Sequence, residues 1–372
     1  MKVAVFVDEL SATGVVNNAI AVAGDLHARG CEVRLVAARA EGTLKPTVPE
    51  EVPVVGLLPP GQVPSSRPRR LVRTLRAYRG FVGDFAPDVL FSSGNHAHLA
   101  SLFAAGAAPK CRTVVRISND LRHAVAGRRR RNPVPRWLRE TSFRLIAERA
   151  DRLVFVSDHL RRQAAASVDL AEKGVVIPNG VDLTAIHRRA QEHCPHDWLS
   201  QSDPVVLAVG RLVRQKNLHN LIRAVALARN SRPLRLLLLG SGPLRDSLLR
   251  EAEALGIGGA VEILPPVPNP IPYIDRSSVL ALPSWWEGSS NVLLEALACE
   301  TPIVASDTAG SAAEVLDEGR FGLLVNPTDV RAMADALVRQ SSTSAIRPGA
   351  RAEAFSRDAA LGAYAGLILK QG

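Results

Sequence analysis

The glutamates at positions 287 and 295 have the residue type and the spacing to bind a polyol. They flank seven residues and follow a short apolar stretch at 279–282. We expect a helix to begin near Ser290, which leaves Glu287 in the preceding loop and Glu295 about one turn inside the helix. Carboxylates accept hydrogen bonds from adjacent hydroxyls, so one could bind a sugar and the other a ribose. Two glutamates alone, however, are more often a helix-start charge and a solvated side chain.

The expected start of that helix is also a site for an anion. The first N–H groups of a helix have no acceptor within the helix, and the helix dipole favours negative charge there. We therefore expect the backbone at Asn291 and Val292 to bind phosphate, with Gly288 and Ser289 in the loop beside it.

Two cations, Arg211 and Lys216, follow the apolar stretch 205–209 and are expected in one loop at a strand end. Together they could neutralise the diphosphate of a nucleotide sugar, whose charge grows as the glycosidic bond breaks. The chain contains no Asp-x-Asp triplet. We therefore expect the lysine ammonium to replace a divalent metal, and we predict a site that uses neither metal nor cofactor. On a basic protein the same two residues could equally belong to a solvated loop.

Glycines after two other apolar stretches could bring the backbone close to a ligand. Gly240 opens a tight turn after 234–239, and Gly14 follows the first apolar stretch, 3–7, and opens a helix. Because glycine has no Cβ, a phosphate can approach its backbone closely, and we include both among the candidate donor-binding residues. Each is also explained as an ordinary turn glycine.

The elements that must position these residues alternate along the chain in a regular way. Short apolar stretches alternate with helix-period segments, which is typical of parallel sheets covered by helices on both faces. The expected strands of the first half are 3–7, 32–37, 52–57, 88–92, 113–117, 152–156 and 175–177, and those of the second half are 205–209, 234–239, 261–264, 279–282, 302–305 and 322–325. The fold class is therefore α/β, with two doubly wound, Rossmann-like domains facing a cleft.

The domain boundaries follow from where these patterns stop. We predict one domain at 1–182, a polar linker at 183–203 and a second domain at 204–350. The last segment, 351–372, is expected to be a helix. A chain of 372 residues is long enough for two such cores.

The motifs, in their order, resemble the family 4 retaining glycosyltransferases of the GT-B architecture over nearly the whole chain. The similar segments are 156–157, 178–182, 210–212 with 216–217, 240–243, 283–288 with Glu295, and 301–307 with Glu314. The resemblance implies that Arg211 and Lys216 bind the donor diphosphate and that Glu287 contacts the donor sugar. These three are the catalytic residues that it implies. It also implies that Glu295 contacts the ribose. The resemblance further implies that 1–182 is the acceptor-binding domain, that 204–350 is the nucleotide-sugar-binding domain, and that the helix at 351–372 packs back on the first domain.

The same resemblance implies a retaining hexosyltransferase that moves a hexose or N-acetylhexosamine from a UDP or GDP sugar. Such enzymes are thought to retain configuration by same-face attack, and a double displacement, which needs a carboxylate close to the anomeric carbon, stays an alternative. Where many relatives have a histidine, this chain has Arg116 and Asn119. That variant is closer to subfamilies that build cell-surface glycans, so both residues are acceptor-side candidates.

The net charge of +10 is concentrated in the first half, where arginines cluster at 67–79 and 122–144 around Trp137. An anionic membrane surface is the natural partner of such charge, since each cation near it contributes roughly 1 kcal/mol. No apolar run approaches the ~20 residues that a spanning helix needs, and the first stretch is interrupted by Asp8 and Glu9. We therefore expect a cytoplasmic protein at the inner face of the plasma membrane, acting on a lipid-linked or polysaccharide acceptor. A solvated arginine-rich face is the alternative.

Three rival functions stay open. A nucleic-acid-binding protein would share the charge, but aromatic residues make up only 4% of the chain and do not alternate with the arginines, so we expect no nucleic acid partner. A sugar-nucleotide epimerase or a phosphorylase could use the same fold. The third rival function is that of a donor-binding subunit without catalytic activity.

Overall fold

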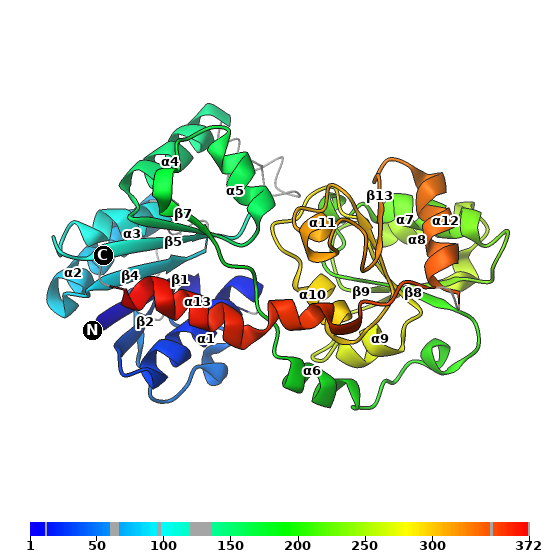
Figure 1. The fold of residues 1–372 in the computed structure, drawn as a ribbon, viewed down its shortest axis with the longest axis horizontal. Helices are drawn as coiled ribbons and strands as arrows, with labels where there is room; N and C mark the ends of the chain where they lie inside the picture. Colours follow the sequence, from blue (N-terminus) through cyan, green and yellow to red (C-terminus); the bar gives the residue numbers. More distant parts are fainter. Residues whose placement is uncertain (12, 60–66, 95–97, 120–135, 343–344, 371–372) are drawn as a thin grey trace. The chain divides into compact units, whose positions relative to one another are not determined.

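The computed structural model describes residues 1–11, 13–59, 67–94, 98–119, 136–342 and 345–370, without the side chains of 67–71 and 136 (Figure 1). These residues form two compact units. Unit 1 contains the described residues up to 179 and those from 360 onward, and unit 2 contains residues 180–359. Each unit is built around its own parallel sheet.

In the described part of unit 1, seven parallel strands lie in the order β3-β2-β1-β4-β5-β6-β7. They are β1 (Lys2–Glu9), β2 (Glu32–Arg39), β3 (Val54–Gly56), β4 (Val89–Ser93), β5 (Arg112–Ile117), β6 (Arg152–Phe155) and β7 (Gly174–Val176). The helices are α1 (Gly14–Ala28), α2 (Arg67–Phe85), α3 (His98–Ala105), α4 (Arg136–Arg149), α5 (Asp158–Ala165) and α13 (Arg357–Leu369).

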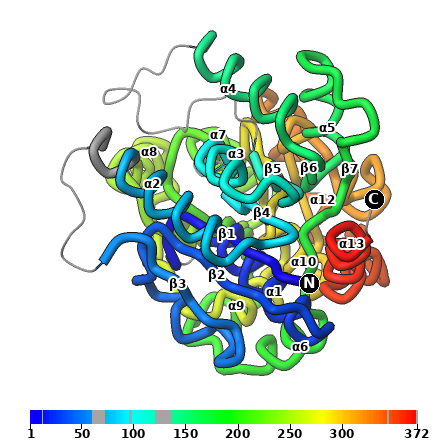
Figure 2. Tube along the Cα trace, turned by 90° about the vertical axis from the view of Figure 1, so that its left-hand side faces the viewer, coloured from blue at the N-terminus to red at the C-terminus, as the bar shows by residue number. Residues whose placement is uncertain are grey.

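The alternation of side chains along β1 explains how this sheet is covered. Val3, Val5 and Val7 pack in the core shared with α1 and α13. Ala4 and Phe6 face the opposite way, and the Phe6 ring stacks on Tyr78 of α2 with 4.2 Å between ring centroids. Because successive residues of a strand point to opposite faces, one apolar run fills two cores. In Figures 1 and 2, α1 and α13 accordingly lie together, away from α2 and α3.

Unit 2 repeats this architecture, and its described strands lie in the order β10-β9-β8-β11-β12-β13. They are β8 (Val205–Val209), β9 (Arg235–Leu239), β10 (Val261–Leu264), β11 (Val279–Leu282), β12 (Ile303–Ser306) and β13 (Leu323–Val325). The helices are α6 (Leu183–Ala190), α7 (Leu218–Ala228), α8 (Arg245–Ala254), α9 (Ile271–Arg276), α10 (Asn291–Ala298), α11 (Ala312–Val315) and α12 (Val330–Gln340). The two parallel sheets confirm the predicted α/β class, and the strand positions agree with the predicted ones to within a few residues.

Residues 183–203, which we predicted as a linker, are instead part of unit 2. They form α6 and a short 3-10 helix, Asp197–Ser200. Ile186 and Ala190 are buried in the core of unit 2, and Trp198 packs against it. The physical reason is that Leu183, Ile186 and Ala190 share one face of a helix, an apolar period that the surrounding arginines and histidines obscure.

The end of the chain is broken into two helical pieces rather than one. The first is a 3-10 helix, Gly349–Phe355, and the second is α13. Ser356 between them has an extended backbone and pairs with Val181 in a parallel bridge inside unit 2. From residue 360 the chain belongs to unit 1, where Tyr364 and Ile368 are buried. No helix among the described residues is long and apolar enough to cross a membrane.

Candidate functional site

The candidate residues of unit 2 gather where the strand order of its sheet reverses. β8 pairs with β11 in parallel, while the chain continues from β8 outward to β9 and from β11 outward to β12. The loops after β8 and β11 therefore leave the same edge of the sheet, at the switch point where doubly wound sheets bind ligands. These loops carry Arg211 and Lys216 after β8, and Ser284 and Glu287 after β11.

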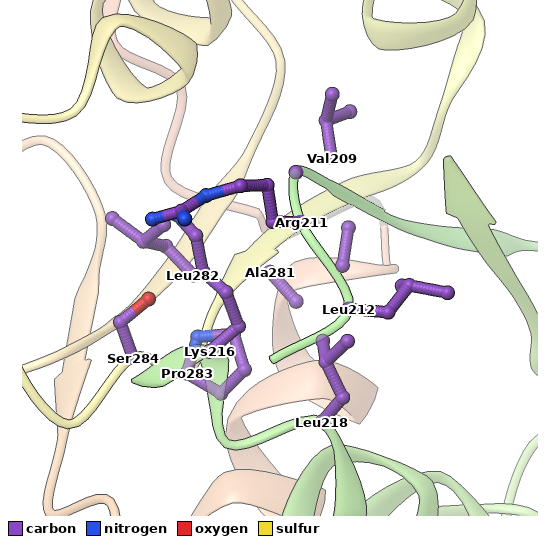
Figure 3. Close-up of a pocket in the computed structure, with 11 residues that line it drawn as sticks. Val209, Arg211, Leu212, Lys216, Leu218, Ala281, Leu282, Pro283 and Ser284 are labelled. Carbon is purple, nitrogen blue, oxygen red and sulfur yellow. The ribbon is translucent and has the colours of Figure 1, made fainter. Parts of the chain in front are cut away.

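A small pocket lies between these two strand ends. Figure 3 shows Arg211, Lys216 and Ser284 among the residues that line it. The apolar part of the lining comes from the strands themselves, through residues such as Val209 and Leu282. The lining thus combines apolar residues with a few charged and polar side chains, which is the usual composition of a small-molecule site.

A largely buried ion pair of the site joins Lys216 to Glu287. The Lys216 Nζ atom lies 2.6 Å from Glu287 Oε1, and the two side chains are only 17% and 11% exposed. The Ser284 hydroxyl donates to the same carboxylate oxygen at 2.7 Å. Pairing and hydrogen bonding are what permit charged groups to be this buried.

Gln215 holds the two loops together beside this ion pair. Its backbone carbonyl accepts a hydrogen bond from the Trp285 N–H at 2.9 Å, and its side-chain Nε2 donates to the Trp286 carbonyl at 2.8 Å. Because Gln215 precedes Lys216 and Trp286 precedes Glu287, these two bonds fix the backbone on both sides of the pair. The next residue, Asn217, has a left-handed φ of 53° and donates from Nδ2 to the Pro327 carbonyl at 2.9 Å.

Gly240 has a packing role that its sequence context only suggested. A Cβ atom at this position would lie 1.8 Å from the Gly210 carbonyl oxygen, so no larger residue fits without moving the loop. Gly310 stands in a similar relation to Glu287, since a Cβ atom there would lie 2.1 Å from the Glu287 carbonyl oxygen. Glycines thus allow neighbouring loops to approach one another closely around the ion pair.

Helix α10 begins at Asn291, one residue after the predicted position, and its N-cap residue Ser290 makes no side-chain capping bond. The early backbone N–H groups, such as that of Val292, have no acceptor within the helix by the geometry of its first turn. Gly288 is buried and Ser289 is half-buried in the preceding loop. This end of α10 has the electrostatics expected for binding an anion.

Glu295 lies further along α10 in a half-buried position. Burial raises the pKa of its carboxyl group, and the positive charge of Arg189 opposes that rise. Arg189 comes from α6, the helix in the predicted linker, so sequence reasoning missed it. The structure therefore places the two glutamates in different environments: Glu287 is paired with a lysine, whereas burial raises the pKa of the Glu295 carboxyl group.

Arg211 differs from Lys216 in being exposed. Among the residues that the structure describes, Arg211 forms no ion pair, although it lines the same pocket. Its five N–H donors are therefore available to an anionic ligand, and a guanidinium can bind phosphate oxygens in pairs.

The unit 1 candidates have different surroundings. Gly14 is the first residue of α1, whose N-cap Thr13 accepts from the Val16 N–H at 3.3 Å. Arg116 is 1% exposed and donates to Tyr364 Oη at 2.9 Å and to Asn179 Oδ1 at 2.5 Å. Arg116 thus ties α13 to β5 inside unit 1.

Asn119, unlike Arg116, is exposed. It is the more accessible of the two acceptor-side candidates. The arginine run 128–131 lies outside the described residues.

Sequence reasoning also missed Ser284 and Gln215. Ser284 could have been noticed because it lies just after β11, where parallel sheets place functional residues. Gln215 lies in the same strand-end loop as Lys216, but its role depends on a loop 71 positions away and so could not be inferred from its position. Among the described residues, no group of three His, Cys, Asp or Glu side chains could hold a metal ion.

The described residues thus form two doubly wound units, with a cationic loop and a paired glutamate at the switch point of the second. Solved structures agree on the fold: Anabaena HepE in complex with UDP superposes with a TM-score of 0.79 at 18% identity, covering 99% of this chain and 100% of that one. Residues 12–185 match the family described as Glycosyltransferase Family 4, and residues 203–342 match Glycosyl transferases group 1. The chain belongs to the family 4 glycosyltransferases.

Curated relatives are similar over part of the chain. The N-acetylgalactosamine-N,N'-diacetylbacillosaminyl-diphospho-undecaprenol 4-alpha-N-acetylgalactosaminyltransferase of Campylobacter jejuni is 33% identical over 50% of this chain and 49% of its own length. The D-inositol 3-phosphate glycosyltransferase of Corynebacterium urealyticum is 41% identical over 52% of this chain and 49% of its own length. The matches thus span about half the length of these relatives.

Proposed function

We propose that this chain is a retaining, metal-independent glycosyltransferase. It moves a hexose or N-acetylhexosamine from a UDP or GDP sugar to a lipid-linked or polysaccharide acceptor in cell-surface glycan synthesis. The observation that carries this proposal is the 2.6 Å contact between Lys216 Nζ and Glu287 Oε1, beside the exposed Arg211 at the switch point of unit 2.

The donor diphosphate binds to the cations and to the start of α10. An ammonium group has three N–H donors, and Lys216 directs one of them at Glu287. Lys216 can therefore contact the carboxylate and the diphosphate at once, while Arg211 binds the diphosphate from the exposed side. As the glycosidic bond breaks, negative charge grows on the departing phosphate. These cations therefore stabilise the transition state more than they stabilise the bound donor.

The two glutamates bind the two ends of the donor. Glu287 accepts from a sugar hydroxyl, and Glu295 accepts from the ribose hydroxyls. The configuration is retained by same-face attack, in which the acceptor hydroxyl enters beside the departing phosphate and gives its proton to that phosphate. This path needs no side-chain nucleophile, which agrees with Glu287 being held by Lys216 and Ser284.

The acceptor is proposed to bind to unit 1, where Asn119 is exposed just after the end of β5. The names of the relatives support a polar glycan or lipid-linked acceptor: one names a diphospho-undecaprenol glycan and another names inositol 3-phosphate. Both are sugar or polyol compounds with a phosphate. A basic unit 1 is the matching electrostatic partner.

Exposed residues on three neighbouring helices of unit 1 support binding to the anionic inner face of the plasma membrane. Helix α2 packs against α3, and α3 against α4. Their exposed apolar residues are Val72 at 59%, Phe103 at 54%, Trp137 at 64% and Leu138 at 40%. Exposed arginines accompany them at positions 73, 76 and 79 on α2 and 144 on α4. Apolar side chains that insert at the interface, beside cations that attract anionic lipid, are the requirements for peripheral binding.

The enzymatic proposal is tested by measuring thermal stability and nucleotide-sugar hydrolysis with UDP, GDP, ADP and their sugars. We expect one nucleotide to stabilise the wild-type chain and its sugar to be hydrolysed, with both effects lost in Lys216→Ala and Glu295→Ala. Arg245→Ala, an exposed cation on α8 of the same unit, is the matched control and should behave as wild type. An epimerised sugar without release of nucleotide would favour an epimerase. No response to any nucleotide, with salt-sensitive binding to DNA or RNA, would favour the nucleic-acid alternative.

The membrane proposal is tested separately by sedimentation with vesicles of phosphatidylcholine alone or with added phosphatidylglycerol. Binding should require the anionic lipid, weaken with salt, and fall in a Phe103→Ser and Trp137→Ser double variant. Leu255→Ser, an exposed apolar residue of unit 2, is the control. Equal binding to both vesicle types would contradict the electrostatic part of the proposal.

A further inference from the structure

Ser284 is a buried residue of the site whose hydroxyl contacts Glu287. The residue is 0% exposed, and its hydroxyl donates to Glu287 Oε1 at 2.7 Å. Its carbonyl oxygen accepts a hydrogen bond from the Ser306 hydroxyl at 2.8 Å, and Ser306 is also 0% exposed. The backbone that carries the Ser284 hydroxyl is therefore anchored on the neighbouring strand β12.

We propose that Ser284 is a positioning residue that orients the carboxylate of Glu287 so that one oxygen faces the donor sugar. This inference rests on the proposed function, because it assigns a role within the binding of a nucleotide sugar. It adds to that function a residue that acts on the substrate only through Glu287.

The two oxygens of Glu287 are not equivalent in the structure. Oε1 accepts from both Lys216 Nζ, at 2.6 Å, and Ser284 Oγ, at 2.7 Å. Oε2 accepts no hydrogen bond from any residue that the structure describes. A carboxylate held at one oxygen by two donors cannot rotate freely, so its second oxygen keeps a fixed direction.

The chemistry of that second oxygen defines what it recognises. An ionised carboxylate oxygen is an acceptor only, and a neutral hydroxyl is a donor that causes no charge repulsion. Oε2 is thus suited to a hydroxyl of the sugar and not to the anionic diphosphate, which the cations bind. Loss of the Ser284 hydroxyl should consequently weaken recognition of the sugar while leaving recognition of the nucleoside diphosphate intact.

The test compares two ligands of the full chain: the nucleotide sugar that the wild type hydrolyses among UDP-glucose, UDP-N-acetylglucosamine and GDP-mannose, and the corresponding nucleoside diphosphate. For Ser284→Ala we expect kcat/KM for hydrolysis to fall about tenfold, as for a lost hydrogen bond to a charged group. The Kd of the nucleoside diphosphate should stay within about twofold of wild type, since the cations that bind it are unchanged. Ser284→Thr, which keeps the hydroxyl, should recover most of the lost kcat/KM.

Ser277→Ala is the matched control, because Ser277 is a buried serine that donates to the Ile274 carbonyl at 2.8 Å, away from the two site loops. It should leave both ligands unaffected. If Ser284→Ala hydrolyses the sugar as wild type does, or weakens both ligands in the same proportion, Ser284 does not position Glu287 and the inference is overturned. A wild-type chain that binds no nucleoside diphosphate would overturn the proposed function itself, and this inference with it.

Discussion

Lys216 and Glu287 are 71 positions apart in the chain, yet the Lys216 ammonium lies 2.6 Å from a Glu287 carboxylate oxygen. The contact joins the loops that follow two adjacent parallel strands, β8 and β11. Both side chains are mostly buried, so each compensates the other for lost solvation. The cation proposed to stabilise the leaving group and the carboxylate proposed to bind the sugar therefore belong to one ion pair.

Removal of one partner of this pair should cost more stability than removal of both. We expect Lys216→Met to lower the free energy of unfolding by about 1–3 kcal/mol, because it leaves the Glu287 carboxylate buried without its counter-charge. The Lys216→Met, Glu287→Gln double variant should recover part of that loss. Urea denaturation of the wild type, both single variants and the double variant gives the coupling energy. Strictly additive losses would mean that the two charges do not interact in solution.

Gln215 should couple the stability of the loops to the affinity for the donor. Gln215→Ala removes the donor to the Trp286 carbonyl, and we expect a loss of about 1–2 kcal/mol in unfolding free energy with a weaker Kd for the nucleoside diphosphate. Gln340→Ala is the matched control, since this buried glutamine donates to the Ile303 carbonyl at 3.0 Å outside the site. Gln340 also exchanges two hydrogen bonds with the Ile346 backbone, so the variant should lose at least as much stability as Gln215→Ala, without a change in Kd. Equal affinity in both variants would show that the side-chain bond of Gln215 does not shape the site.

The raised pKa of Glu295 should make stability depend on pH in a defined direction. Because burial raises its pKa in the folded protein, the folded state holds the proton more tightly than the unfolded state does. The contribution of Glu295 to the free energy of unfolding is therefore most favourable below its pKa in the unfolded chain, about 4.3. That contribution is lost as the pH rises through its pKa in the folded protein.

The non-titrating variant Glu295→Gln isolates this effect. We expect it to match the wild type near pH ~4 and to be more stable near pH ~7, measured by the urea midpoint at each pH. Arg189→Met should have the opposite effect at neutral pH, because it removes the charge that opposes the rise in pKa. A variant Glu295→Gln that is less stable than wild type at neutral pH would contradict the assigned direction.

The close approach at Gly240 predicts a severe effect of a single methyl group. In Gly240→Ala the new Cβ would lie 1.8 Å from the Gly210 carbonyl oxygen, so the loop that carries Arg211 must move. We expect a loss of at least about 3 kcal/mol in unfolding free energy, together with loss of nucleotide binding. Gly256→Ala is the control, because Gly256 has a φ of +71° but a Cβ added there would meet no described atom within 4 Å, and it should cost about 1 kcal/mol. If the two variants lose similar free energy of unfolding, steric crowding at Gly240 is not the cause of its effect.

Much of the fold and part of the site could be predicted from the sequence. The strands of both sheets are continuous apolar runs because parallel strands are buried on both faces, and such runs can be recognised without knowing what they contact. Glu287, Arg211 and Lys216 could be selected because they follow such runs at the ends of strands. The start of α10 at Asn291 was likewise indicated by the residues around it.

Other features were decided only by the tertiary structure. The sequence by itself determined which residues stand at strand ends, since local patterns of apolar residues specify the elements. It did not determine that α6 belongs to unit 2, or that the charge of Arg189 affects the pKa of Glu295. Nor did it determine that Ser284 and Lys216 donate to the same oxygen of Glu287. These relationships depend on which strands pair and how closely the loops pack. Their burial and electrostatics arise only when the sheet brings those loops together, because neither property belongs to a residue in isolation.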